Sequence, residues 1–157
     1  MKSVGVNEKC VLESPGLNPK PAYFAYQNLC AVFDGRYKPV KIMSKVTIDD
    51  PGIFRGVGDE DDAFPSIPLV SSFKTATDKY FIAYWLPWYP QEIIREGRIT
   101  LAAGDAKFKD PVLIDLLDGE VHSVEFTVED SGILFKNIPL ADYPYVIVER
   151  GEVEISP

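Results

Sequence analysis

The most constraining feature of this sequence is a succession of short apolar or alternating segments, each closed by Gly, Pro, Asp or Asn, from residue 37 onward. In residues 40–48, Val40, Ile42 and Val46 share one face with Ile48, while lysines and a threonine occupy the other, which predicts a half-buried strand. The same reasoning predicts further strands near residues 68–75, 79–86, 98–103, 112–117, 120–128, 132–138 and 145–149. Strands at this spacing predict a mainly β fold, an antiparallel β-sandwich of about eight strands.

Two local patterns refine this expectation. In Leu116-Leu-Asp-Gly-Glu-Val121 the pair Asp118-Gly119 predicts a two-residue turn between paired strands. Residues 80–86, YFIAYWL, are apolar on both faces, so we expect a central strand that includes Trp85 in the core.

One helix is predicted ahead of the sandwich, over residues 20–35, KPAYFAYQNLCAVFDG. Pro21 suits the first helical turn, and Asp34-Gly35 supplies a stop. At about 100° per residue, Phe24 and Ala31 lie opposite the main apolar stripe. That stripe, which we expect the sandwich to cover, comprises Ala22, Ala25, Tyr26, Leu29, Cys30 and Phe33. The uncovered side, Phe24 and its neighbour Tyr23, would then form an apolar patch of the kind that marks an interaction surface.

Length and charge limit the classes of function. A chain of 157 residues is expected to form one domain. Its 24 acidic residues against 16 basic ones give a net charge of −8, which argues against a nucleic-acid partner. No apolar run approaches the roughly 20 residues of a membrane-spanning helix, so no membrane partner is expected. Residues 1–8 lack the apolar core of a signal peptide, but the compartment stays undetermined, because a sequence can be cut to begin here.

No motif predicts a catalytic residue or a cofactor. A hydrolytic triad needs a histidine base, and the one histidine, His122, lies in a predicted strand near Glu120, where a solvated or satisfied side chain is the simpler interpretation. Gly56 and Gly58 have no helix after them to complete a phosphate-binding loop.

The acidic run at residues 59–62 could hold calcium, but its spacing is not that of a calcium loop, and a solvated loop is the favoured interpretation. Cys10 and Cys30 lack the clustered spacing of a zinc site and are expected to be free thiols. No metal site is therefore predicted.

Exposed aromatic residues offer a binding hypothesis. Trp88 and Tyr89 lie in the proline-framed connection Leu86-Pro-Trp-Tyr-Pro90, where rings can be held outward to stack on sugars, with Tyr80 as a further candidate. The competing interpretation is that these rings bury against another part of the same polypeptide, because large aromatics are frequent at interfaces.

Four segments carry a resemblance to a known class of enzymes. KPAYFAYQNL at 20–29, YWLPW at 84–88, PVLIDLLDGEV at 111–121 and IPLADYPYVI at 138–147 resemble the C-terminal region of bacterial glycoside hydrolases, in which a (β/α)8 barrel precedes a β-sandwich. The resemblance implies that residues 1–36 correspond to a loop and the last barrel helix, and residues 37–157 to the accessory sandwich. The barrel strands that carry the catalytic carboxylates in such families have no counterpart here, so it implies no catalytic residue.

Three functional hypotheses follow from these observations. The favoured one is a non-catalytic accessory domain that braces the (β/α)8 barrel of the same polypeptide through Tyr23 and Phe24. The alternative is an autonomous carbohydrate-binding module that binds polysaccharide through Trp88, Tyr89 and Tyr80. A small independent enzyme is the least favoured. The sugar, its linkage and the oligomeric state do not follow from the sequence.

Overall fold

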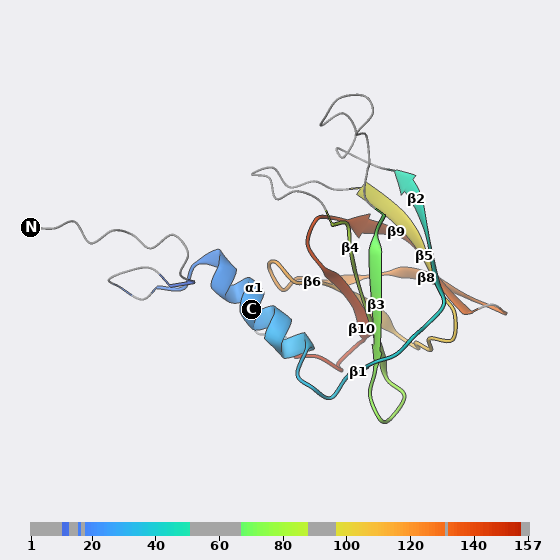
Figure 1. Cartoon of the computed structure of the whole chain (residues 1–157), viewed down its shortest axis with the longest axis horizontal. Coiled ribbons are helices and arrows are strands. Elements are labelled where there is room, and N and C mark those ends of the chain that lie inside the picture. Colours follow the sequence, from blue (N-terminus) through green and yellow to red (C-terminus); the bar gives the residue numbers. More distant parts are fainter. Residues whose placement is uncertain are drawn as a thin grey trace, which may run out of the picture.

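The computed structural model of the chain contains two antiparallel β-sheets and one helix, which confirms the predicted β-sandwich class (Figure 1). The structure describes residues 11–12, 16, 18–50, 67–87, 97–130 and 132–154. Trp88, Tyr89, Cys10 and the acidic run at 59–62 lie outside the described residues.

The larger sheet has six strands in the order β1-β3-β4-β10-β6-β7. All five neighbouring pairs are antiparallel. Its strands are β1 (Lys38–Pro39), β3 (Leu69–Lys74), β4 (Tyr80–Trp85), β6 (Pro111–Asp115), β7 (Val121–Ser123) and β10 (Tyr145–Glu149). As predicted, β4 lies inside the sheet, between β3 and β10, with residues buried on both faces.

The smaller sheet has four strands in the order β2-β5-β9-β8. They are β2 (Ser44–Asp50), β5 (Gly97–Ala103), β8 (Glu125–Glu129) and β9 (Gly132–Leu140). Together the two sheets have ten strands among the described residues, against about eight predicted.

The additional strands arise where the chain changes sheets. The predicted strand at 40–48 begins after β1 of the larger sheet and continues as β2 of the smaller one. The predicted strand at 120–128 is two strands, β7 in the larger sheet and β8 in the smaller one, with Val124 between them where the chain crosses. Ile42 and Val124 at the crossings still pack against the core, so the apolar alternation continues through both and does not reveal them.

The predicted hairpin joins β6 and β7, but its connection is longer than the two residues expected. The Asp115 N–H donates to the Glu120 carbonyl, which leaves residues 116–119 as the loop, with Gly119 at φ 82°. The Asp115 carboxylate accepts the Leu117 N–H at 2.8 Å, an Asx turn that competes with continued strand pairing. Leu116 is buried beneath the helix, which further favours this loop.

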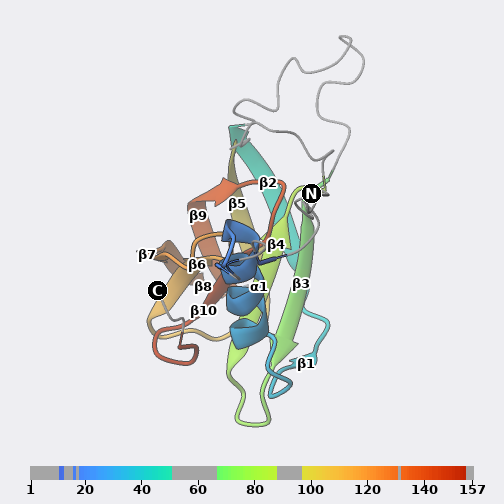
Figure 2. The ribbon, with the colours of Figure 1, turned by 90° about the vertical axis from the view of Figure 1, so that its left-hand side faces the viewer.

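Two apolar cores cover the two faces of the larger sheet. The inter-sheet core lies between the sheets and includes Ile82, Leu101 and Phe135. The helix-side core lies on the opposite face and includes Phe81, Ile114 and Val146 together with Val32 of the helix. Figure 2 shows the helix lying in front of the larger sheet, so that the sandwich and the helix share one packed structure.

The helix α1 spans Pro21–Val32, and Pro21 occupies its first turn as predicted. The predicted orientation is wrong: Tyr26, Leu29 and Phe33 of the expected covered stripe are exposed. The fully buried helix residues are Asn28 and Val32. The Asn28 side-chain amide donates to the buried Leu116 carbonyl at 3.4 Å, which offsets the cost of burying it. Because nearly every position of this helix is apolar, the pattern alone does not select a face.

Candidate functional site

The outer surface of α1 is apolar and carries no charge. Its twelve residues, PAYFAYQNLCAV, include no Asp, Glu, Lys or Arg, in a protein where these make up 25% of the residues. Its five exposed large side chains have exposed fractions between 37% and 63%, including the neighbouring Phe33: Tyr23, Phe24, Tyr26, Leu29 and Phe33. We call these five the helix face. An uncharged, aromatic surface helix is typical of a docking surface.

A groove of about 310 Å³ lies beside α1 and extends this surface. Its lining comes from the helix, the β6–β7 loop and the segment before β10, and contains no charged residue: Ala25, Tyr26, Leu29, Leu116, Leu117, Tyr143 and Pro144. Leu117 is 42% exposed, so the apolar surface continues from the helix onto the β6–β7 loop. We call this the apolar groove. The sequence did not predict it, because its walls are far apart in the chain and meet only in the fold.

The C-terminal end of α1 is held by aromatic packing. The Phe33 ring lies edge-on to Phe81 and Phe73, with centroids 5.0 and 5.4 Å away. Phe73 and Phe81 stack at 4.4 Å, and Tyr37 packs edge-on to Phe81 at 4.7 Å. A helix of this length is marginal in isolation, so these contacts, with Asn28 and Val32, fix the direction of the helix face.

The predicted interdomain residues Tyr23 and Phe24 are both part of the helix face. They form an edge-on pair with centroids 5.6 Å apart and exposed fractions of 37% and 42%. By helical spacing Phe24 and Tyr26 lie on opposite flanks of α1, so the apolar groove borders only one of the two flanks.

Tyr80, predicted as a sugar-stacking residue, is only partly exposed. It packs against the inter-sheet core, and its centroid lies 6.5 Å from that of Phe108. The Lys74 ammonium lies 5.6 Å from the Tyr80 centroid, over the ring. A sugar could stack on that face of the Tyr80 ring only after displacing the Lys74 ammonium. The cation–π contact between Lys74 and Tyr80 is itself stabilising, so displacing it would cost free energy.

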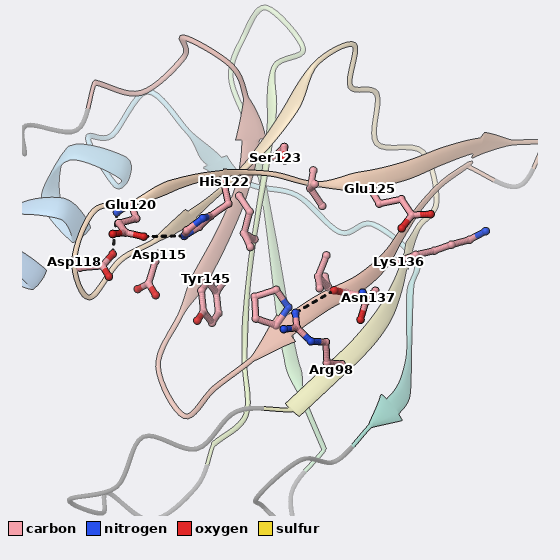
Figure 3. A pocket seen from close by; sticks show the side chains of 14 residues that line it. Arg98, Asp115, Asp118, Glu120, His122, Ser123, Glu125, Lys136, Asn137 and Tyr145 are labelled. Atoms are coloured by element: carbon pink, nitrogen blue, oxygen red, sulfur yellow. Dashed lines mark hydrogen bonds and ion pairs between the residues drawn. The ribbon is translucent and has the colours of Figure 1, made fainter.

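A second hollow, about 610 Å³ in volume, lies between the sheets where the six-stranded sheet ends at β7. Figure 3 shows Asp118, Glu120 and His122 of the β6–β7 hairpin on one side of it and Arg98 and Asn137 on the other. Residues 123–125, where the chain crosses from β7 to β8, close one end. We call this hollow the inter-sheet cleft.

The side of the cleft formed by β5 and β9 is built on a β-bulge. Between the pairs Ile99↔Ile138 and Leu101↔Phe135, β5 has one residue whereas β9 has two, Lys136 and Asn137. Asn137 has a φ of 52°, a left-handed conformation that asparagine tolerates better than most residues. The Arg98 guanidinium donates to the Asn137 carbonyl at 3.4 Å. Bulges re-aim side chains and occur often beside binding sites.

A row of polar side chains crosses the larger sheet behind the cleft. Tyr84 on β4 is directly opposite Tyr145 on β10, which is directly opposite Asp115 on β6. The Tyr143 hydroxyl donates to the Asp115 carboxylate at 3.0 Å and lies 3.1 Å from the Tyr145 hydroxyl. Asp115 is 7% exposed, and its carboxylate is held in place by partly buried hydrogen bonds from the Leu117 N–H and the Tyr143 hydroxyl.

The Tyr84 hydroxyl is fully buried at the inner end of this row, and it has no hydrogen-bond partner among the described residues. Burial, and then the charge of Asp115, raise the pKa of Tyr84 well above its usual value of 10.0, while Arg98 opposes the shift. The hydroxyl is thus within electrostatic reach of groups on both sides of the cleft. On the hairpin side, His122 Nε2 lies 3.6 Å from a Glu120 carboxylate oxygen, as their spacing suggested.

Within the described residues, no group of three or more His, Cys, Asp or Glu side chains is placed to hold a metal ion. In the same part of the chain no helix is long and apolar enough to cross a membrane. The sequence matches no protein-family model, and no curated protein is significantly similar to it.

Proposed function

We propose that this protein is a non-catalytic accessory β-sandwich domain of a glycoside hydrolase, which braces a (β/α)8 catalytic barrel of the same polypeptide through the helix face and the apolar groove. The observation that carries the proposal is the charge-free surface of α1, continuous with an uncharged groove, in a protein of net charge −8. The resemblance of four sequence segments to the C-terminal regions of such enzymes supports the choice of partner.

Leaving the helix face in water costs free energy that docking would recover. Burying apolar area stabilises a contact by about 25 cal/mol per Å², and the helix face offers five large side chains that are more than a third exposed. Rigid packing of Phe33 and Asn28 against the sheet lowers the entropy cost of docking. A brace needs a rigid apolar contact of this kind and no reactive group.

A direct test compares the wild-type chain with a variant that places charges on the helix face, Tyr26→Lys with Leu29→Glu. We expect the wild type to bind a hydrophobic dye and to self-associate as its concentration rises, measured by fluorescence and sedimentation velocity. Both signals should fall in the variant. The matched control is Val128→Glu, which changes an apolar residue that is 74% exposed on β8, and which should leave both signals unchanged.

A wild-type protein that stays monomeric and dye-silent would contradict the docking role, and hydrolysis of glycosides by this chain would contradict the non-catalytic one. A reading frame that encodes a (β/α)8 barrel upstream of Met1 would support the choice of partner. The autonomous carbohydrate-binding module makes a different prediction, namely that Trp88→Ala abolishes polysaccharide binding while the charged helix-face variant retains it.

A further inference from the structure

We propose that the inter-sheet cleft is a binding site for a neutral, polyhydroxylated ligand, a short saccharide, which is bound by hydrogen bonds between the β6–β7 hairpin and the bulge of β9. This site is separate from the helix face and does not depend on docking through α1. It also does not use the aromatic residues Trp88, Tyr89 and Tyr80.

The size and position of the cleft suit a small ligand. Its volume of about 610 Å³ is within the range of about 300–1,000 Å³ that is usual for small-molecule sites. Its sides come from strands or their tight connections, and polar groups carried by such elements are positioned more precisely than groups on long loops. Asn137 is held by the bulge, and Asp115 by the Tyr143 hydroxyl and the Leu117 N–H.

The chemistry of the two sides favours hydroxyl groups. The hairpin side presents the carboxylates of Asp118 and Glu120, which accept hydrogen bonds, and the opposite side presents the Arg98 guanidinium, which donates them. A sugar hydroxyl both donates and accepts, so a ligand with hydroxyls along its length can satisfy both sides at once. His122, Ser123 and Asn137 add groups that can do either.

The charge of the lining argues against an anionic ligand. Four carboxylates line the cleft against two cations: Asp115, Asp118, Glu120 and Glu125 against Arg98 and Lys136. A phosphate or sulfate group would meet this excess of negative charge and be repelled by it. A neutral ligand avoids that repulsion and still uses the Arg98 guanidinium as a donor.

The buried row behind the cleft supports a binding role. An isolated hydroxyl such as that of Tyr84, buried without a partner among the described residues, reduces stability. An unsatisfied buried polar group in a folded protein calls for an explanation, and a functional role is one such explanation. Here the row ends at Asp115 on β6, next to the edge strand β7, and Asp115 and Tyr145 line the polar cleft.

The test measures binding to the full chain by calorimetry, with cellobiose, maltose and xylobiose as probes and with inorganic phosphate and glycine as charged comparators. We expect at least one saccharide to bind saturably. Arg98→Met removes the guanidinium donors but keeps the aliphatic stem, and should weaken binding by about tenfold or more. Asn137→Gly removes the amide at a position whose φ glycine accepts without strain, and should also weaken it.

The matched control is Arg150→Met, which removes an exposed guanidinium that pairs with Asp110 outside the cleft. It should leave affinity unchanged, and the melting temperatures of all three variants should stay close to that of the wild type. The proposal is overturned if no saccharide binds, if binding survives Arg98→Met and Asn137→Gly undiminished, or if phosphate or glycine binds in the cleft in place of saccharide. Because the helix-face experiment uses different residues and signals, either proposal can fail while the other stands.

Discussion

The two apolar cores of this protein differ in how they are closed. Among the described residues, the inter-sheet core contains sixteen that are buried, and it is enclosed by a sheet on each side. The helix-side core contains nine and is covered by one short helix, which contributes Val32 as its only fully buried apolar residue among those described. The inter-sheet core is covered by described strands on both sides. The helix-side core is covered by α1, whose outer side is itself apolar and exposed. We therefore expect the inter-sheet core to supply most of the stability, and the docking role proposed above would explain why the helix face is apolar.

The β6–β7 hairpin separates the two surfaces that accompany these cores. Leu116 points into the helix-side core and Leu117 lines the apolar groove, while Asp115 and Glu120 line the inter-sheet cleft. Tyr143 connects the apolar groove with the inter-sheet cleft, because it lines the groove and donates a hydrogen bond to Asp115, which lines the cleft. A single connection thus divides an apolar docking surface from a polar cleft, which would bring a bound saccharide close to a docked partner.

The comparison is tested most severely by Phe135→Ala. Phe135 is fully buried in the inter-sheet core, against Phe108 and Phe126, and its removal should lower the free energy of unfolding by about 3–5 kcal/mol. Chemical denaturation followed by circular dichroism measures the loss. The variant Phe135→Leu retains most of the volume and should lose much less. A loss below about 1 kcal/mol for alanine would mean that the inter-sheet core is not the main source of stability.

The second prediction concerns the helix-side core. Val32→Ala removes two buried carbons, and should lower the free energy of unfolding by about 2 kcal/mol, less than Phe135→Ala. We further expect amide hydrogen exchange to accelerate in α1 and to change little in β5 and β9. Equal acceleration in those strands would show that the two cores unfold as one unit, and would remove the distinction drawn between them.

The sequence predicted the elements of the fold better than their connections. Alternating or wholly apolar segments bounded by turn residues identified β3, β4, β5 and β10 closely, because each lies in one sheet for its whole length. Alternation joined β7 to β8, because an inward Val124 at the crossing continues the same period. Likewise Asp118-Gly119 located a hairpin, but the extra loop length depends on tertiary contacts of Asp115 and Leu116.

The candidate site was predictable only in part. The apolar character of α1 and the exposure of Tyr23 and Phe24 were predicted, but the buried face depends on long-range contacts: the Asn28–Leu116 hydrogen bond and the packing of Val32 and Phe33. The inter-sheet cleft was not foreseen, because Arg98, Asp115 and Asn137 come from three strands and share no local motif. Among the residues that line the cleft, the sequence suggested only His122, with its neighbour Glu120, as a candidate functional group.

A third prediction separates the cores through pH. An unfolded tyrosine loses its proton near pH 10.0, whereas buried Tyr84 keeps it to a higher pH, so above that pH the folded state binds more protons. Below pH 10.0, Tyr84 is protonated in both the folded and the unfolded state, so its ionisation should not change the free energy of unfolding. Above pH 10.0, the free energy should fall by about 1.4 kcal/mol per pH unit until the folded pKa is reached.

Tyr84→Phe should remove the part of the fall in unfolding free energy above pH 10.0 that comes from Tyr84. At neutral pH it should change the free energy of unfolding by less than about 1 kcal/mol, because it deletes an unpartnered hydroxyl. Denaturation at a series of alkaline pH values measures both effects. Burial, and then the charge of Glu152, raise the pKa of Tyr37 in the helix-side core as well, so a smaller slope should persist in the variant. An unchanged slope would show that Tyr84 does not stay protonated in the folded protein.

The smallest expected effect is that of Leu29→Gln, for which the same substitution at Leu101 in the inter-sheet core serves as the comparison. Leu29→Gln changes a residue of the helix face that is 37% exposed, so its amide can remain in water and stability should change by no more than about 0.5 kcal/mol. Leu101→Gln places the same amide in the closed inter-sheet core, where an unpaired polar group should destabilise the fold severely. Denaturation curves for both variants, with dye binding for Leu29→Gln, make the comparison. If Leu29→Gln lowers dye binding without lowering stability, the helix face is apolar for a reason other than folding, as a docking surface requires. If it destabilises the protein as Leu101→Gln does, the helix face belongs to the core and the docking role loses its basis.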